Sequence, residues 1–346
     1  MKGCDIVNYR IPKPHQDIFR PEVYYCRKAK GKLELDGNLD KEFWAHAPWT
    51  KDFVDIEGDI RPKPRFRTRV KMLWDEEAIY FGAELMGDEI WAHITRRDDV
   101  IFYDNDFEIF IDPDSDTQCY YEFEMNALNT VWDLLLTKAY RDGGMPMNGF
   151  DLKGLRSAVK IYGELNNPYA NNVKWTCEVV MPFESLLECT GQNARIPEPG
   201  DFWRINFSRV QWKVDVVDGK YVKRINQETN KPYPEDNWVW SPIGVINMHY
   251  PELWGYVFFC DGKEDYEIPE DEKLKWELRR LYYEQHAYFD ENGRFTTDIR
   301  SLNSNIQPKI QVTDNWFEIS CLSSDKKRQL IIFADGRTTS KEIGRR

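Results

Sequence analysis

Two neighbouring runs in the middle of the sequence alternate between apolar and polar residues with a period of two. In the first run, FYDNDFEIFIDPDSD (102–116), Phe107, Ile109 and Ile111 alternate with mostly acidic residues. The second run, YYEFEMNA (120–127), alternates in the same way. Since successive side chains of a strand point to opposite faces of a sheet, each run predicts a strand with one apolar and one polar face. The intervening DPDSDTQC is rich in turn residues, so we expect the two strands to form a hairpin.

Short runs of the same kind continue from about residue 31 to residue 260, separated by Gly, Pro, Asn and Asp. The runs are FRTRVKMLWD (66–75), AIYFGAEL (78–85), VWDLLL (131–136), SAVKIYG (157–163), KWTCEVVMP (174–182), DFWRINFSRVQW (201–212) and WGYVFF (254–259). Many alternating strands at short spacing are typical of an antiparallel β-sandwich. We therefore predict a mainly β protein.

The composition changes after residue 262. Apolar residues recur at helical spacing over 270–292, and Gly293 is a typical stop signal. Short β-like runs follow, so residues 263–346 are predicted to form a small C-terminal α+β unit. The sequence LRRLYYEQHAYFDENGRFTTDIRSL in this unit is similar to the helix and following loop of type IV pilin and pseudopilin heads. The predicted organisation is an N-terminal extension (1–25), the sandwich (26–262) and the α+β unit.

The charge and the cysteines exclude several classes of partner. A formal net charge of −12 argues against nucleic acid or anionic lipid as the main partner, because both repel an acidic surface. The sequence contains no run of 18 apolar residues, so it predicts no transmembrane segment. The N-terminal residues lack the apolar segment of a secretory signal. The seven cysteines form no CxxC pair, so neither a zinc site nor a c-type haem is expected.

The polar face of the predicted hairpin poses an electrostatic problem. It carries Glu108 on one strand and Glu122, Glu124 and Asn126 on the next. Like charges that lie opposite each other across a sheet are destabilising, so arginines, a cation or hydrogen-bond donors of a ligand are needed to offset them. Sugar hydroxyls are such donors, and the 13 Trp, 18 Tyr and 19 Phe residues are numerous enough to supply stacking surfaces as well as a core.

Seven segments, in order along the chain, resemble the family 9 carbohydrate-binding modules and the DOMON-like β-sandwiches around them. The segments are GKLELDGNLDKEFWAHAPWT (31–50), RVKMLWDEEAIYFGAEL (69–85), DFEIFIDP (106–113), YYEFEMNALNTVWD (120–133), WTCEVVMPFESL (175–186), FWRINFSRVQW (202–212) and WSPIGVINMHYPELWGYVFF (240–259). The resemblance covers about residues 26–260 and implies an immunoglobulin-like or DOMON-like jelly-roll sandwich.

The resemblance also implies a function and a site. It implies non-catalytic binding of an oligo- or polysaccharide, such as xylan or glucan, on the concave face of the sandwich, and a periplasmic or extracellular location. It places Glu108, Glu124 and Asn126 at polar positions that bind the ligand. It places Phe102 or Tyr103 at a first aromatic wall, and it places the second wall near Met248 and His249. There Met replaces the expected aromatic ring. Trp238 or Trp240 is the alternative stacking residue, and a pocket that is open on that side is the third alternative. The sequence does not indicate an oligomeric state.

Calcium is the one cofactor that the sequence suggests. Asp112, Asp114 and Asp116 of the DPDSD turn bring three carboxylates into a tight loop, which is a plausible oxygen cage for calcium. The resemblance implies bound calcium as structural support. An ordinary acidic turn is the alternative interpretation.

Two other functions fit parts of the pattern. A glycoside hydrolase uses a pair of carboxylates, and Glu108, Glu122 and Glu124 are candidates for such a pair. A DOMON-type haem site needs axial His or Met ligands, and the sequence offers five His residues together with Met72, Met125 and Met248.

Overall fold

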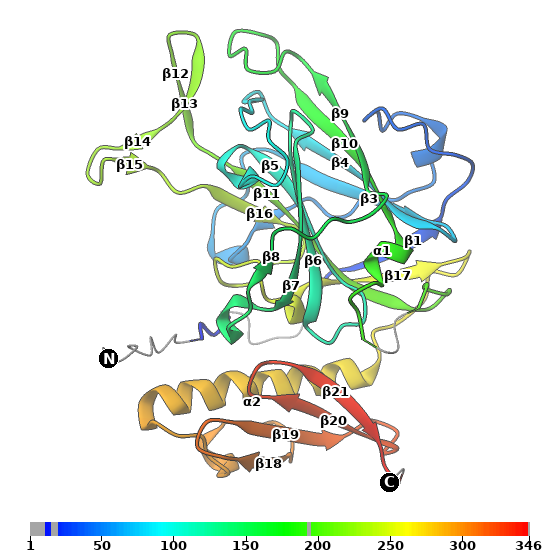
Figure 1. Cartoon of the computed structure of the whole chain (residues 1–346), viewed down its shortest axis with the longest axis vertical. Coiled ribbons are helices and arrows are strands. Elements are labelled where there is room, and N and C mark those ends of the chain that lie inside the picture. The colour runs from blue at the N-terminus through cyan, green and yellow to red at the C-terminus, as the bar shows by residue number, and fades with distance from the viewer. Residues whose placement is uncertain (1–10, 15–19, 192–194, 345–346) are drawn as a thin grey trace.

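We describe a computed structural model of the chain over residues 11–14, 20–191 and 195–344 (Figure 1). Cys4, His15 and most of the predicted N-terminal extension lie outside the described residues. Among the described residues, no helix is both long enough and apolar enough to cross a membrane.

The predicted β-sandwich is confirmed, and most of the predicted runs are strands. The strands of the large sheet are β1 (Val23–Lys28), β2 (Val54–Asp55), β3 (Thr68–Trp74), β4 (Ala78–Met86), β5 (Asp106–Asp112), β6 (Gln118–Asn126), β7 (Val131–Lys138), β8 (Pro146–Met147), β9 (Arg156–Tyr162), β10 (Lys174–Pro182), β11 (Phe202–Gln211), β16 (Asp236–Val239) and β17 (Gly255–Cys260). The order of strands is β8-β7-β6-β5-β11-β17-β1-β3-β4-β10-β9, and β16 pairs with both β11 and β2.

The sheet folds over itself to make two layers. Strands β7, β6, β5 and β11 form one layer, and β3, β4, β10 and β9 form the other. Neighbouring strands within each layer are antiparallel, whereas β1 pairs in parallel with both β17 and β3 and joins the layers. The connection through β1 is what allows one hydrogen-bonded sheet to enclose a core.

The core between the layers is built from the apolar faces that the alternation predicted. Phe107, Ile109 and Ile111 of β5 are buried there together with Phe81 of β4. Phe207 of β11 lies between the layers, and its ring centroid is 5.9 Å from that of Phe107 and 5.8 Å from that of Phe81. The polar face of β5 and β6 therefore points away from this core, toward the outside of the sandwich.

Short helical turns and two hairpins decorate the sandwich. The turns are η1 (Glu42–Trp44), η2 (Gly58–Ile60), η3 (Ile101–Tyr103), η4 (Tyr140–Asp142), α1 (Phe183–Leu186) and η5 (Pro251–Leu253). The hairpins pair β12 (Val214–Val217) with β13 (Lys220–Lys223) and β14 (Ile225–Asn226) with β15 (Lys231–Pro232), and they project to one side of the molecule (Figure 1). These hairpins were not predicted from the sequence.

The C-terminal α+β unit is also confirmed. The helix α2 (Glu270–Asn292) matches the predicted range, and Gly293 ends it in the left-handed conformation, with φ of +67°. That conformation strains residues with a side chain but not glycine. The turn η6 (Ile299–Ser301) precedes a four-stranded sheet, in which the order is β18 (Lys309–Val312), β19 (Phe317–Leu322), β20 (Arg328–Phe333) and β21 (Thr338–Glu342). The resemblance to pilin heads stays a prediction.

The C-terminal unit packs against the sandwich through a shared apolar cluster. Phe110 and Tyr120 lie on the polar face of β5 and β6, and they join the same buried cluster as Trp276, Tyr282 and Tyr283 of α2. The element types change at the predicted boundary, since β17 ends at Cys260 and α2 begins at Glu270, but the apolar packing continues across it. Whether residues 26–262 fold without the C-terminal unit stays a prediction.

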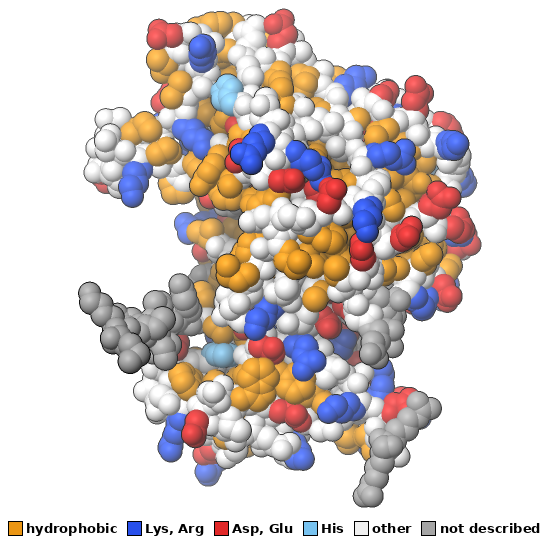
Figure 2. Space-filling model, in the orientation of Figure 1, with side chains coloured by type: hydrophobic (Ala, Val, Ile, Leu, Met, Phe, Trp, Pro, Cys, Tyr) orange, Lys and Arg blue, Asp and Glu red, His pale blue; other side chains and the backbone are white. Residues whose placement is uncertain are grey.

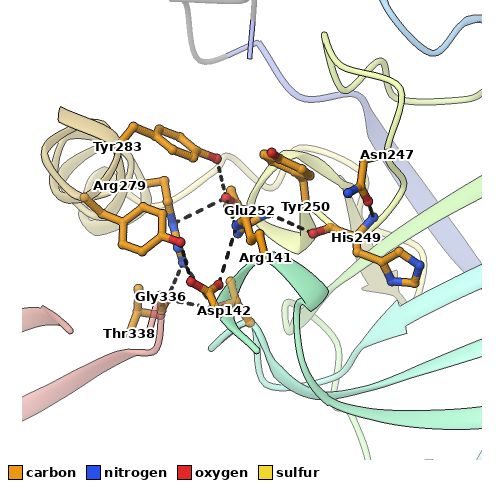
Figure 3. A network of polar contacts seen from close by, with 12 residues as sticks. Arg141, Asp142, Asn247, His249, Tyr250, Glu252, Arg279, Tyr283, Gly336 and Thr338 are labelled. Carbon is orange, nitrogen blue, oxygen red and sulfur yellow. Dashed lines mark hydrogen bonds and ion pairs between the residues drawn. The ribbon is translucent and has the colours of Figure 1, made fainter. Parts of the chain in front are cut away.

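A buried ion network lies at the same junction (Figure 3). Glu252 of η5 accepts hydrogen bonds from Nη2 of Arg141, at 2.7 and 2.9 Å, and from the hydroxyl of Tyr283. Nε of Arg279 lies 3.6 Å from the Glu252 carboxylate. Burial acts to raise the pKa of Glu252, but the charges of Arg141 and Arg279 outweigh it and lower that pKa to about 2. Glu252 is therefore the shared anion between η4, η5 and α2.

The face of the molecule in Figure 2 carries charges of both signs. Lys, Arg, Asp and Glu side chains are interspersed there with apolar ones. This face has no broad patch of one sign such as nucleic-acid binding needs.

We expect Glu252→Gln to destabilise the fold strongly. The substitution removes the carboxylate that the buried Arg141 and Arg279 share, and it leaves Arg141 only the longer contact with Asp142, whose carboxylate lies 3.5 Å from its Nε. Breaking a buried ion pair in this way costs about 3–5 kcal/mol. Urea unfolding at neutral pH measures the change in the free energy of unfolding. The control is Glu270→Gln on the exposed end of α2, for which a change below about 1 kcal/mol is expected. A Glu252→Gln protein as stable as the wild type would contradict this account of the junction.

Candidate functional site: an acidic, aromatic-lined cavity

The pairing of β5 with β6 brings the predicted carboxylates together. Glu108 lies directly opposite Glu124, Asp106 lies opposite Asn126, and Phe110 lies opposite Glu122. Carboxylate oxygens of Asp106, Glu108 and Glu124 lie within 4.8 Å of one another. The two strands therefore place four acids on one patch of the outer face.

This face is largely closed to solvent. Glu108 and Glu122 are each 6% exposed, and Glu124 is 2% exposed. At one end of the face, the rings of Phe110 and Tyr120 are covered by His249 and Trp254. At the other end, the backbone N–H of Phe102 in η3 donates to Glu124 at 3.1 Å. Between these two covers the face opens only into a cavity.

The cavity has a volume of about 370 Å³ and is lined by carboxylates and aromatic rings. This size is within the usual range for sites that bind small molecules. The lining residues are Phe102, Glu108, Phe110, Glu122, Glu124, Trp132, Tyr140, Val210, Glu235, Asn237, Met248 and His249.

The acids of the cavity hold their protons more tightly than ordinary carboxyls. Burial raises the pKa of Glu108 to about 7, and the charge of Glu235 adds to this effect. Burial and then the charge of Glu108 raise the pKa values of Glu122 and Asp106 well above the usual range, and both causes also act on Glu124. Glu108 is therefore poised between its protonated and ionised forms near neutral pH, and its three acidic neighbours keep their protons to a higher pH than ordinary carboxyls do.

The structure brings together some of the predicted site residues and separates others. Phe102, Glu108, Glu124 and His249 line the cavity. Trp240 does not, because its ring packs in the core between the layers, 5.8 Å from the ring of Phe207.

Tyr103 and Asn126 also lie outside the lining of the cavity. Tyr103 is 56% exposed and packs beside Phe102. Asn126 is fully buried, and its Nδ2 donates to the carbonyl of Ile94 at 2.8 Å and to Asp104 at 3.0 Å. Its Oδ1 accepts from the backbone of Leu128 and Thr130, so this amide is fully used in holding the turn after β6.

Tyr140 is a lining residue that the sequence interpretation missed. It belongs to η4, is 41% exposed, and its ring centroid is 4.4 Å from that of His249. Its neighbour Arg141 anchors η4, since Nη1 of Arg141 donates to the carbonyl of His249 at 2.8 Å while Nη2 binds Glu252 (Figure 3). The ion network at the junction therefore also holds the Tyr140 and His249 side of the cavity.

His249 is neutral at physiological pH. Burial, and then the charge of Arg141, lower its pKa to about 3. Its Nδ1 lies 3.0 Å from the hydroxyl of Tyr120. The imidazole therefore contributes a flat polar ring to the cavity and no positive charge.

The DPDSD turn is a separate acidic group, at the end of β5. Carboxylate oxygens of Asp112, Asp114 and Asp116 lie within 4.8 Å of one another, which is compatible with a cation. Both oxygens of Asp112 also accept backbone N–H groups, from Ser115 at 3.0 Å and from Thr117 at 2.9 Å, as in an ordinary acidic turn. Both interpretations stay open, and calcium at this turn stays a prediction.

The ligands considered for haem do not converge on the cavity. Met72 and Met125 are fully buried in the core between the layers. His46 and His93 are exposed. Of the described His and Met candidates, the two that line the cavity are Met248 and His249, which are adjacent in the chain.

A larger groove adjoins the cavity. It has a volume of about 800 Å³ and shares Glu235 and Asn237 with the cavity lining. Its other lining residues include Arg61, Arg65 and Trp238, and Lys213 and Arg224 from the region of the projecting hairpins. The site therefore extends from a closed acidic end to an open groove.

We expect Glu108→Gln to stabilise the free protein at about pH 8 more than at about pH 5. A carboxyl with a raised pKa stabilises the fold at low pH, and that contribution is lost as the pH rises from about 4.5 to about 7. Removing this group should therefore increase the free energy of unfolding at the higher pH by up to about 3 kcal/mol. Urea unfolding at the two pH values measures the difference.

The matched control is Glu84→Gln on β4, for which the opposite sign is expected. Burial acts to raise the pKa of Glu84, but the hydrogen bond from Lys174 and the charge of Arg69 outweigh it, so this pKa is lowered. The ionised form of Glu84 thus stabilises the fold, and its loss should destabilise the protein at about pH 8. If both variants shifted stability in the same direction, the electrostatic account of the cavity would be wrong.

Comparisons with known proteins fit this architecture. Residues 35–157, which include β5, β6 and β7, match the family model described as "Carbohydrate family 9 binding domain-like". A search of curated proteins found no match to the sequence. Among solved structures, a protein from Bacteroides uniformis ATCC 8492 described as "a putative carbohydrate-binding protein" is similar, with 15% identity and a TM-score of 0.50 over 69% of this chain and 100% of that one.

Two similar structures come from Caldicellulosiruptor kristjanssonii. Both are of a family 9 carbohydrate-binding module, one in complex with cellotriose and one with glucose. The cellotriose complex is 14% identical, with a TM-score of 0.43 over 72% of this chain and 98% of that one. The glucose complex is 14% identical, with a TM-score of 0.42 over 71% of this chain and 100% of that one. The match of residues 35–157 to the family model confirms the resemblance predicted from the sequence over that region.

Proposed function

We propose that the cavity binds one sugar residue of an oligo- or polysaccharide, and that the protein acts by binding and cleaves no bond. The observation that carries this proposal is a single cavity of about 370 Å³ that combines the carboxylates of Glu108, Glu122 and Glu124 with the rings of Phe102 and Tyr140. The matched family region contributes β5, β6 and β7, the strands that carry these acids and Trp132.

Sugars suit both parts of this lining. Their hydroxyl groups donate hydrogen bonds, and buried carboxylates need donors in order to ionise. Their C–H faces pack against aromatic rings, which Phe102, Trp132 and Tyr140 supply from three separate elements. The adjoining groove has room for further residues of a chain, which supports an oligo- or polysaccharide such as a glucan or xylan over a free monosaccharide.

Glycoside hydrolysis is the second candidate, and one observation favours it. A carboxyl with a pKa near 7, such as Glu108, suits a general acid at neutral pH. A hydrolase must release product, whereas a binding protein returns the oligosaccharide unchanged. Product analysis on every binding sample therefore distinguishes the two functions.

We expect Glu108→Gln to weaken saccharide binding roughly ten- to a hundredfold, because a hydrogen bond to a charged acceptor contributes about 1.5–3 kcal/mol. Calorimetry with glucan and xylan oligosaccharides, chosen from a glycan array, measures this loss. If the wild type released product, and Glu108→Gln released none but still bound the oligosaccharide, the protein would be a hydrolase and the binding proposal would be wrong.

Phe102→Ala and Tyr103→Ala form a matched pair of substitutions. Phe102 lines the cavity and its neighbour Tyr103 does not, so only Phe102→Ala should weaken binding, by roughly two- to tenfold through lost stacking. The same calorimetry reports both variants. Equal losses for the two, or a loss confined to Tyr103→Ala, would place the ligand outside the cavity.

A further inference from the structure

The acids of the cavity are not balanced by bases. Its lining includes four carboxylates, Glu108, Glu122, Glu124 and Glu235, but no Lys or Arg. The carboxylate of Asp106 lies within 4.8 Å of those of Glu108 and Glu124, and its Oδ2 has no hydrogen-bond partner among the described residues. The cavity therefore concentrates carboxyl groups without a basic side chain among its lining residues.

Basic side chains on neighbouring elements are engaged elsewhere. Arg209 of β11 donates to Gln211 and to the carbonyl of Met86. Arg204 of the same strand binds the carbonyls of Glu252 and Trp254.

The bases on the loops are engaged as well. Arg141 is held by Glu252 and by the carbonyl of His249. The ammonium of Lys223 lies over the ring of Trp212, 3.3 Å from its centroid. None of these cations lines the cavity.

Glu122 has the least support from the protein. Its side chain is buried, faces the cavity, and has no hydrogen bond or ion pair to any described residue. Burying an ionised carboxylate without a partner costs free energy, and within the protein alone that cost is avoided only when the group is protonated. By contrast, Glu124 accepts the N–H of Phe102. The missing partner of Glu122 must therefore come from the solvent or from a ligand.

The rings around the cavity favour an organic cation as that ligand. Phe102, Trp132 and Tyr140 present aromatic surface to the cavity, and aromatic faces attract positive charge as well as C–H groups. The carboxylates of Asp106, Glu108 and Glu124 are close enough together to hold a metal ion, but the aromatic part of the lining offers a metal no oxygen ligands, whereas it suits an organic cation. A neutral sugar can donate hydrogen bonds but leaves the excess negative charge in place.

We propose that the cavity selects a saccharide unit that carries a protonated amine, such as a glucosamine residue, over a neutral sugar of the same shape. The amine neutralises the carboxylate of Glu122 and its neighbours Glu108 and Glu124, while the sugar ring packs against the aromatic side chains. This inference rests on the proposed saccharide-binding function and specifies the chemical class of its ligand.

The test compares β-1,4-linked trimers of glucosamine, glucose and N-acetylglucosamine with the full-length protein. Calorimetry at about pH 6.5, where an amine of ordinary pKa is protonated, measures affinity, and ligand-observed NMR detects weak binding. We expect the glucosamine trimer to bind about tenfold more tightly than either neutral trimer, or better, because it adds a charged hydrogen bond. Glu122→Gln should remove most of that preference, so that the ratio of the affinities for the glucosamine and glucose trimers falls toward one. The control, Glu188→Gln on the exposed surface, should keep the preference.

The outcomes separate this inference from the function on which it rests. Equal binding of all three trimers, or a preference that survives Glu122→Gln, overturns the inference and leaves saccharide binding intact. Binding of none of the trimers overturns both. Cyclohexylamine or choline binding as tightly as the glucosamine trimer overturns the saccharide part, because the site would then recognise any organic cation. Calcium binding that competes with the trimers and is lost in Glu122→Gln overturns the inference in favour of a metal site.

Discussion

The antiparallel pairing of β5 with β6 is the constraint on which the rest of the structure depends. Its register puts Phe107 opposite Met125 and Ile109 opposite Phe123 on the inner face, where they form the core with the second layer. The same register obliges Glu108 to lie opposite Glu124 on the outer face. One register fixes which side chains lie on each face of the strand pair. The hydrogen-bonded ladder that builds the apolar core therefore also brings the acids together on the other face.

Packing by segments far along the sequence determines what becomes of that outer face. Phe110 and Tyr120 interrupt its run of acids and pack against Trp254, which belongs to the same buried apolar cluster as Trp276 and Tyr282 of α2 in the C-terminal unit. The remaining acids are enclosed and lose hydration, which is the main cause of their raised pKa values. The unit also fixes the wall of the cavity, since Glu252 joins Arg279 and Tyr283 of α2 to Arg141 beside Tyr140. A packing interaction far along the sequence thus turns a charged sheet surface into a cavity.

The sequence predicts the faces of the strands well and the surroundings of those faces poorly. Alternation placed Phe107, Glu108 and Glu124 correctly, because side-chain direction in a strand depends only on position. It could not show that Nδ2 of Asn126 is bound to Ile94 and Asp104 or that Trp240 points into the core, since both depend on chain segments distant in sequence. Tyr140 lies in a short helical turn with no periodic pattern to mark it. The one available signal for a covered outer face was the presence of Phe110 and Tyr120 among the acids.

Carboxyl titration by ¹³C NMR on the free protein tests the central claim most directly, with the resonances of Glu108, Glu122 and Glu124 assigned through single Gln variants. The claim is that these buried acids face a cavity without a cation to neutralise them. It predicts that Glu108 titrates near pH 7 and that Glu122 and Glu124 also titrate well above the range of ordinary carboxyls. Titration of all three near pH 4 would contradict the account, because it would mean that the acids are hydrated or already neutralised by a partner within the protein.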